Sequence, residues 1–179
     1  MTETGLRSYQ ESVVVAASAT KLYDLVSDVT RTGEWSPVCT GCRWDAGDEP
    51  GVGGVRVGAW FTGRNELPHR IWETRSLVVV AERGRAFAWA VGGSLARWGF
   101  TMDPVAAGSA TVLTESWAFL PEGIAMFEEK FGDNAQAQIA DRTQLALEGI
   151  PVTLRAIQRI AESPTGLGGG YYAGEGARS

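Results

Sequence analysis

The spacing of hydrophobic residues changes from that of strands to that of a long helix at Pro121. From Cys42 to Leu120, short runs rich in Val, Trp, Phe and Thr are separated by turn sequences, a pattern typical of strands. After Pro121, apolar residues recur every three or four positions as far as residue 162, which is the period of an amphipathic helix. The sequence therefore predicts an α+β protein that forms a sheet first and a long helix at its C-terminal end.

The β-rich part contains six runs, and Ser12–Ala17 is a seventh strand before them. The six are residues 40–46, 55–63, 70–81, 85–91, 95–103 and 110–120. The turns between them are short and rich in Gly, Pro and Asp. Because loops this short join neighbouring strands as hairpins, we expect the sheet to be antiparallel.

Two helical regions flank these strands. Ser18 is placed to cap a short helix that reaches residue 29, and Gly33 and Pro37 make further helix improbable. In the long helix, residues 132–134 are Gly-Asp-Asn, which can break it, and Pro151 should kink it. We expect short helical segments after the first strand and one long, bent C-terminal helix.

Length and charge indicate how many domains the chain forms and which partners it is expected to bind. The 179 residues are enough for one domain, which we place at 9–163, with a flexible N-terminus at 1–8 and a disordered Gly-rich tail at 164–179. The net charge is -5 and there is no long run of Lys or Arg, so a nucleic-acid partner is not expected. No stretch approaches the roughly 20 apolar residues of a membrane span, and residues 1–7 contain no apolar signal segment. We expect a cytoplasmic protein, either a monomer or a homodimer.

The order of elements and four short motifs resemble a known superfamily. The motifs are Ser-Ala-Thr-Lys-Leu-Tyr-Asp-Leu-Val-Ser-Asp-Val at 18–29, Gly-Glu-Trp-Ser-Pro at 33–37, Thr-Glu-Ser-Trp at 114–117 and Leu-Arg-Ala-Ile at 154–157. Over roughly residues 9–162 the chain resembles the START and birch-pollen-allergen (SRPBCC) superfamily, in its bacterial polyketide cyclase/dehydrase-like branch. The resemblance implies a helix-grip fold, with a curved seven-stranded antiparallel sheet wrapped around a long kinked C-terminal helix and two short helices after strand one.

That resemblance also implies a cavity between sheet and helix that takes a hydrophobic small molecule. Members of the superfamily include lipid and hormone carriers as well as aromatase/cyclases. Binding of a hydrophobic or aromatic ligand, lipid or polyketide-like, is one hypothesis; an enzyme of the polyketide cyclase/dehydratase type, without metal or nucleotide cofactor, is the alternative. A protein-interaction domain with exposed Trp side chains is a third. Few acid or base residues fall on inward positions, which favours binding.

Alternation along the strands predicts which side chains line such a cavity, because successive residues point to opposite faces. Trp98, Phe100 and Met102 share one face, and Trp72 lies opposite to Glu73. Aromatic rings of this kind either fill a core or line an apolar pocket. The predicted ligand-binding residues are Trp44, Phe61, Trp72, Trp89, Trp98, Phe100, Glu115, Trp117, Phe127, Phe131 and Arg142.

Glu115 is the exception among these apolar positions, because the same alternation that turns Trp117 inward turns this carboxylate inward. A buried carboxylate must be paired, protonated or bound to a ligand. Arg142 is a possible partner. Alternatively, a β-bulge displaces Glu115 outward, or an Arg of a neighbouring strand pairs with it. Glu115 is also the one weak candidate for catalysis.

His69, at a predicted hairpin turn, is expected in solvent, and no Gly-x-Ser-x-Gly motif accompanies it.

The two cysteines have the spacing Cys39-x-x-Cys42, which redox centres and zinc sites share. A redox pair is expected at a helix N-terminus, whereas this pair follows Pro37 and enters a strand. Structural zinc needs four ligands, and the chain offers two Cys and one His. We therefore predict no metal and no cofactor. Cys42 shares a face with Trp44, so apolar filling of the pocket wall is the expected role.

Overall fold

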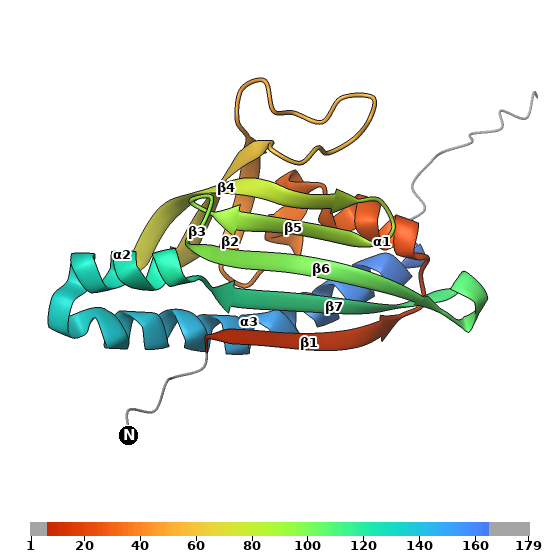
Figure 1. Cartoon of the computed structure of the whole chain (residues 1–179). Helices are drawn as coiled ribbons and strands as arrows, with labels where there is room; N and C mark the ends of the chain where they lie inside the picture. Colours follow the sequence, from red (N-terminus) through yellow and green to blue (C-terminus); the bar gives the residue numbers. More distant parts are fainter. Residues whose placement is uncertain (1–6, 165–179) are drawn as a thin grey trace, which may run out of the picture.

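The structure is a computed structural model, and it describes residues 7–164. Seven strands form one antiparallel sheet in the order β1-β7-β6-β5-β4-β3-β2 (Figure 1). Their bounds are β1 Ser8–Val15, β2 Cys39–Trp44, β3 Trp60–Leu67, β4 Arg70–Glu82, β5 Ala86–Val91, β6 Ala96–Val105 and β7 Ala110–Phe119. The predicted seven-stranded antiparallel sheet is confirmed.

The helices lie where the changes of period predict them, except for one short 3-10 helix, η2 (Ala106–Gly108), in the expected turn before β7. They are α1 Ala19–Val26, the 3-10 helices η1 Val29–Glu34, η2 Ala106–Gly108 and η3 Gly132–Asn134, and the α-helices α2 Pro121–Phe131 and α3 Ala135–Glu162. The side chain of Ser18 accepts a hydrogen bond from the Lys21 N–H and so caps α1. The break at Gly132 is confirmed, and α3 continues through Pro151.

Two strands differ from prediction. The third strand was expected at 55–63 but spans Trp60–Leu67, and the backbone N–H of Trp60 donates to a carboxylate oxygen of Asp48 at 3.0 Å. Gly54 and Gly58 have φ values of +79° and +90°, which end regular strand structure before Trp60. The first strand was expected to begin at Ser12 but begins at Ser8, because it pairs with β7 from that residue onward.

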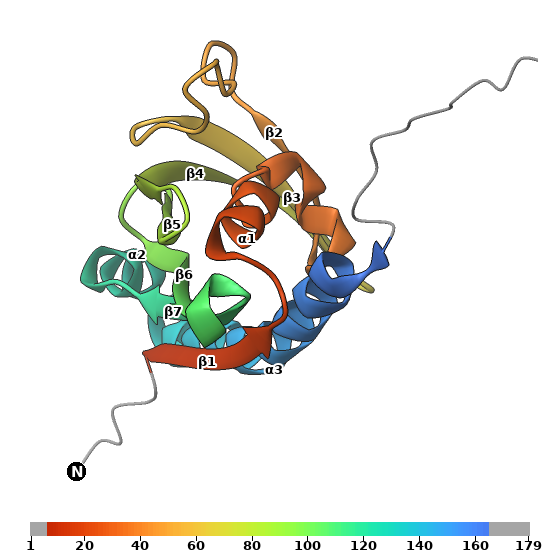
Figure 2. The same cartoon turned by 90° about the vertical axis from the view of Figure 1, so that its right-hand side faces the viewer.

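The sheet forms an arc from β1 to β2, and α3 closes its open side, as the helix-grip fold requires (Figure 2). The inner stripe of α3 is buried against the sheet and α1. Its apolar core positions are Ala135, Ile139, Ala146, Ile150, Leu154, Ala156, Ile157 and Ala161. Among the described residues, no helix has the length and apolar character to cross a bilayer.

Almost all of the predicted terminal segments, 1–8 and 164–179, lie outside the described residues. Their flexibility therefore stays a prediction from the sequence.

Candidate functional site

Aromatic rings of β2, β3, β5 and β6 meet on the concave face of the sheet. The ring of Phe61 lies 5.6 Å from that of Trp44 and 6.2 Å from that of Trp89. Trp89 in turn lies 6.0 Å from Phe100. These four residues belong to four different strands, so the sheet assembles the row from segments far apart in the chain. The predicted inward register of all four is what brings their rings together.

A second aromatic row runs from the sheet to α2. Trp98 and Trp117 are opposite in register, with ring centres 6.3 Å apart. Phe119 continues this row toward Phe127 at 5.1 Å, and Phe131 lies 5.2 Å beyond it. The start of α2 directly after β7 therefore places its two Phe side chains at the end of the concave face.

Burial separates the predicted residues into two groups. Phe61, Phe100 and Trp117 are 3–4% exposed and act as core residues. Trp89 and Trp98, in contrast, are only half-buried, although β5 and β6 are flanked by strands on both sides. Since their side chains share the inner face with the buried rings, solvent reaches them from the concave side or its open end.

Glu115 lies at the centre of β7 and is 4% exposed. Its register with Phe100 is unbroken along the whole β6–β7 ladder, so the alternative of a bulge that turns it outward is wrong. Its Oε2 atom is buried and has no hydrogen-bond partner among the described residues. Burial raises the pKa of Glu115 well above the ordinary value of 4.5. The carboxyl group can therefore stay protonated and donate a hydrogen bond.

The suggested ion pair between Glu115 and Arg142 is not formed. Arg142, on α3, instead lies with its guanidinium 5.8 Å from the ring of Phe127. Burial, together with the positive charge of Arg70, lowers the pKa of Arg142. A helix side chain cannot be placed against a strand residue from sequence alone, because the rotation and position of α3 along the sheet are set by packing.

Arg70 is a residue of this region that the sequence prediction missed. Its guanidinium lies 3.9 Å from the ring of Trp72, the half-buried Trp of β4. Its Nε atom is buried without a partner, and among residues 7–164 neither Arg70 nor Arg142 forms an ion pair. The available signal was the spacing of two residues between Arg70 and Trp72, which puts them on one face of a strand.

Two hollows of the surface lie beside the aromatic rows, and Trp117 borders the second of them. One, of about 600 Å³, is lined by residues 66–71 at the β3–β4 hairpin. Another, of about 450 Å³, lies over β1, β6 and β7 and is lined by residues that include Ser8, Gln10 and Arg97. His69 is exposed in the hairpin turn, as expected.

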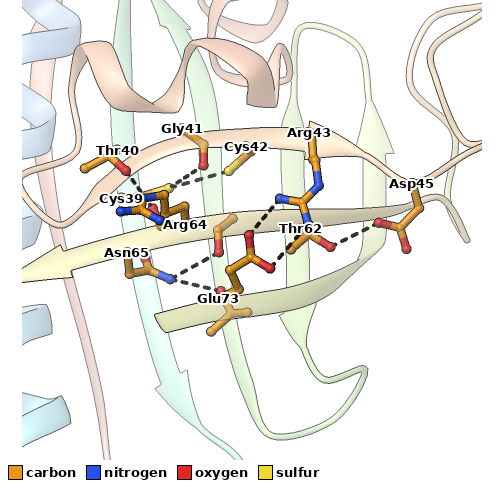
Figure 3. A network of polar contacts seen from close by, with 12 residues as sticks. Cys39, Thr40, Gly41, Cys42, Arg43, Asp45, Thr62, Arg64, Asn65 and Glu73 are labelled. Atoms are coloured by element: carbon orange, nitrogen blue, oxygen red, sulfur yellow. Dashed lines mark hydrogen bonds and ion pairs between the residues drawn. The ribbon is translucent and has the colours of Figure 1, made fainter. Parts of the chain in front are cut away.

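Both cysteines lie on the concave side of β2, at the edge of the sheet. Their sulfur atoms are 3.5 Å apart (Figure 3), and both thiols are free. Gly63 of β3 faces them, since a side chain there would begin 3.1 Å from the sulfur of Cys42. The prediction that Cys42 and Trp44 share a face is confirmed, because their partners in β3 are Gly63 and Phe61.

Comparisons with known proteins agree with this architecture. The solution NMR structure of the polyketide-cyclase-like protein Cgl2372 from Corynebacterium glutamicum shares 49% identity, with 90% of this chain and 93% of that chain covered and a TM-score of 0.62. The Zhui aromatase/cyclase from Streptomyces sp. R1128 shares 15% identity, with 87% and 93% covered and a TM-score of 0.64. A START superfamily protein from Mycobacterium smegmatis shares 17%, with 88% and 98% covered and a TM-score of 0.57.

No curated protein matches the chain. The sequence profile of one family, described as polyketide cyclase / dehydrase and lipid transport, matches residues 7–148. Since that match spans most of the 179 residues, and the sheet and C-terminal helix form a helix grip, the chain belongs to the polyketide cyclase / dehydrase and lipid transport family.

Proposed function

We propose that this protein binds a hydrophobic or aromatic small molecule, lipid or polyketide-like, between the concave face of the sheet and α3. The observation that carries the proposal is the partial exposure of Trp89 and Trp98 on the inner face of interior strands, with Trp72 partly exposed where β4 pairs only with β3. Large aromatic surface that remains in contact with water inside a fold is available to an apolar ligand. The family of lipid-transport and cyclase proteins supports the same ligand class.

Polar groups near these rings suggest the chemistry of the ligand. A protonated Glu115 donates a hydrogen bond to an oxygen acceptor such as a carbonyl or hydroxyl group. Arg70 and Arg142 present two guanidinium groups without a carboxylate partner in the described chain. Because half-buried like charges are stabilised by an anion, we expect an elongated apolar ligand that carries an acidic group at one end.

Fluorescence titration tests binding directly. Flat aromatic compounds and fatty acids are added to the full chain, and intrinsic Trp emission is followed. We expect a saturable change and an affinity at least tenfold lower in Trp98→Ala, which corresponds to about 1.4 kcal/mol. Trp60→Ala is the matched control, since Trp60 stacks beneath Arg75 on the opposite face of the sheet from Phe61.

The control should bind within about twofold of the natural chain, because a single surface substitution away from the site changes little. Equal loss of affinity in Trp98→Ala and Trp60→Ala would place the ligand elsewhere. A flat response to every compound would contradict binding itself.

A second function is favoured by one observation, the buried and unpartnered carboxyl of Glu115. A carboxylic acid that keeps its proton at neutral pH can act as a general acid. In a cyclase or dehydratase, it would protonate a carbonyl or departing hydroxyl oxygen of a poly-β-carbonyl substrate. Incubation with a poly-β-ketone thioester should then yield a product lighter by one water, and Glu115→Gln should abolish it while ligand binding persists. Binding of the thioester without formation of any product would contradict the enzymatic function and indicate a carrier.

A further inference from the structure

The two thiols are brought together by a local irregularity of β2. In a regular strand, residues three apart point to opposite faces. The register with β3 shifts here, because Cys39 lies opposite Asn65 and Gly41 opposite the next residue, Arg64. This β-bulge inserts one residue and turns both sulfur atoms to the concave face, 3.5 Å apart (Figure 3).

The segment before the bulge holds Cys39 in place. The side-chain oxygen of Ser36 accepts hydrogen bonds from the N–H groups of Val38, at 3.2 Å, and Cys39, at 2.8 Å. Gly33 of η1 approaches so closely that a Cβ atom there would lie 2.3 Å from the carbonyl oxygen of Thr40. The backbone before Cys39 is thus held by Ser36, and the backbone after it is held by the contact between Gly33 and Thr40. These contacts keep the two thiols close together.

The two thiols differ in acidity. A hydrogen bond from Cys42 lowers the pKa of Cys39 to about 7. The pKa of Cys42 is raised, first by that hydrogen bond and then by burial. Cys39 is therefore the more acidic of the two thiols, and as a thiol it also contacts the carbonyl oxygen of Gly41 at 3.6 Å. A lowered thiol pKa is typical of reactive dithiols.

A metal site fits the surroundings less well. In the part of the chain that the structure describes, no group of three Cys, His, Asp or Glu side chains could hold a metal ion. The neighbours of the pair are instead Gly63 of β3 and the hydroxyl group of Thr32, which interacts with the thiol of Cys42. Two thiols with neutral neighbours are better suited to disulfide formation than to binding zinc, which needs further ligands.

We propose that Cys39 and Cys42 form a redox-active dithiol that is oxidised to an intramolecular disulfide by low-molecular-weight disulfides. The Cys39 thiolate attacks one sulfur of RS–SR, forming a mixed disulfide and releasing RS⁻. Cys42 loses its proton to solvent, and its thiolate attacks the sulfur of Cys39, releasing a second RS⁻. In total, the dithiol loses two electrons and two protons, and RSSR becomes two RSH.

Little movement is needed for the second step. The sulfur atoms must approach from 3.5 Å to a bonded distance of about 2.05 Å. Gly63, opposite the pair, has no side chain to obstruct their rotation. The proposal does not depend on the identity of any ligand in the aromatic region, since no step involves one.

Oxidised glutathione is a suitable probe. The reduced full chain is mixed with it, quenched in acid, treated with N-ethylmaleimide and weighed intact. We expect the natural chain to lose about 2 Da and take up no maleimide, because both thiols enter one disulfide. Cys42→Ser should accumulate a glutathione adduct on Cys39, and Cys39→Ser should react at least tenfold more slowly.

The unfolded chain in urea is the internal reference, which keeps the test informative if a variant fails to fold. The folded chain should close its disulfide at least tenfold faster than the unfolded chain, because the bulge holds the thiols together. Equal rates in the folded and unfolded chains, persistence of two alkylated thiols, or disulfide-linked dimers would each overturn the proposal. So would equal reactivity of the two single variants when both are folded.

Discussion

Glu115 combines two properties that rarely occur together in one side chain, nearly complete burial and a carboxyl oxygen without a partner. A buried polar group of this kind costs stability unless the site has another use for it. Phe100 and Glu11 are its neighbours in register on the two adjacent strands, and neither supplies a positive charge. The position is thus better suited to a neutral acid than to a carboxylate.

The raised pKa of Glu115 predicts a pH-dependent stability. Between the unfolded and folded pKa values, the folded state keeps a proton that the unfolded chain has released, so stability falls as pH rises. Glu115→Gln has no such proton, and we expect it to gain about 1–3 kcal/mol relative to the natural chain between pH 5 and pH 8. Urea unfolding at the two pH values measures this.

Glu129→Gln, an exposed substitution on α2, is the control and should show the same difference from the natural chain at both pH values. If the difference between Glu115→Gln and the natural chain is also independent of pH, Glu115 does not hold a proton in the folded state.

At the scale of elements, η1 and β2 depend on close backbone packing. Both are six residues long, and β2 is an edge strand paired only with β3. Their junction places Gly33 against the carbonyl of Thr40, a contact between backbone atoms. Backbone atoms cannot move aside as the end of a flexible side chain can, so this contact admits no larger residue.

Gly33→Ala should therefore destabilise the protein by about 1–3 kcal/mol, the usual cost of overpacking. Gly53→Ala is the matched control, because Gly53 is exposed and a Cβ atom there would meet nothing within 4 Å. Chemical unfolding of both variants measures the difference. Equal stability of the two would mean that η1 and β2 are not packed as the structure has them.

At the scale of the whole molecule, the last turns of α3 are hydrogen-bonded to the first strand, the residue after it and the first helix. The hydrogen bonds are from the Gln158 side chain to the Val14 carbonyl at 2.9 Å, from the Ala16 N–H to the Glu162 carboxylate at 2.8 Å, and from the Lys21 ammonium to the Ala161 carbonyl at 2.7 Å. The two ends of the folded domain are thereby tied together. The contacts that close the fold extend to residue 162.

A chain that ends after Ser163 keeps all of these contacts. The sequence of residues 164–179 has no apolar period that would pack on the domain. We therefore expect its melting temperature to change by less than about 4 °C, or about 1 kcal/mol for a domain of this size. Calorimetry of both chains measures the two melting temperatures. A fall of more than about 4 °C in the shortened chain would show that the C-terminal residues contribute to stability.

Much of the architecture followed from the sequence, because strand and helix periods are local properties. Alternation alone predicted that Trp98, Phe100 and Glu115 face the helix, and Gly132 marked the break before α3. Turn residues indicated antiparallel hairpins in the same way. None of these inferences requires knowledge of which segments meet across the fold.

The tertiary structure decided what depends on register and on contacts between distant segments. Pairing with β7 extended the first strand to Ser8, and the bulge against β3 brought Cys39 beside Cys42. Packing of α3 separated Arg142 from Glu115 and set it near Arg70. A local pattern specifies the face of a side chain but not its partner, because the partner is chosen by how whole strands and helices align over long stretches of chain.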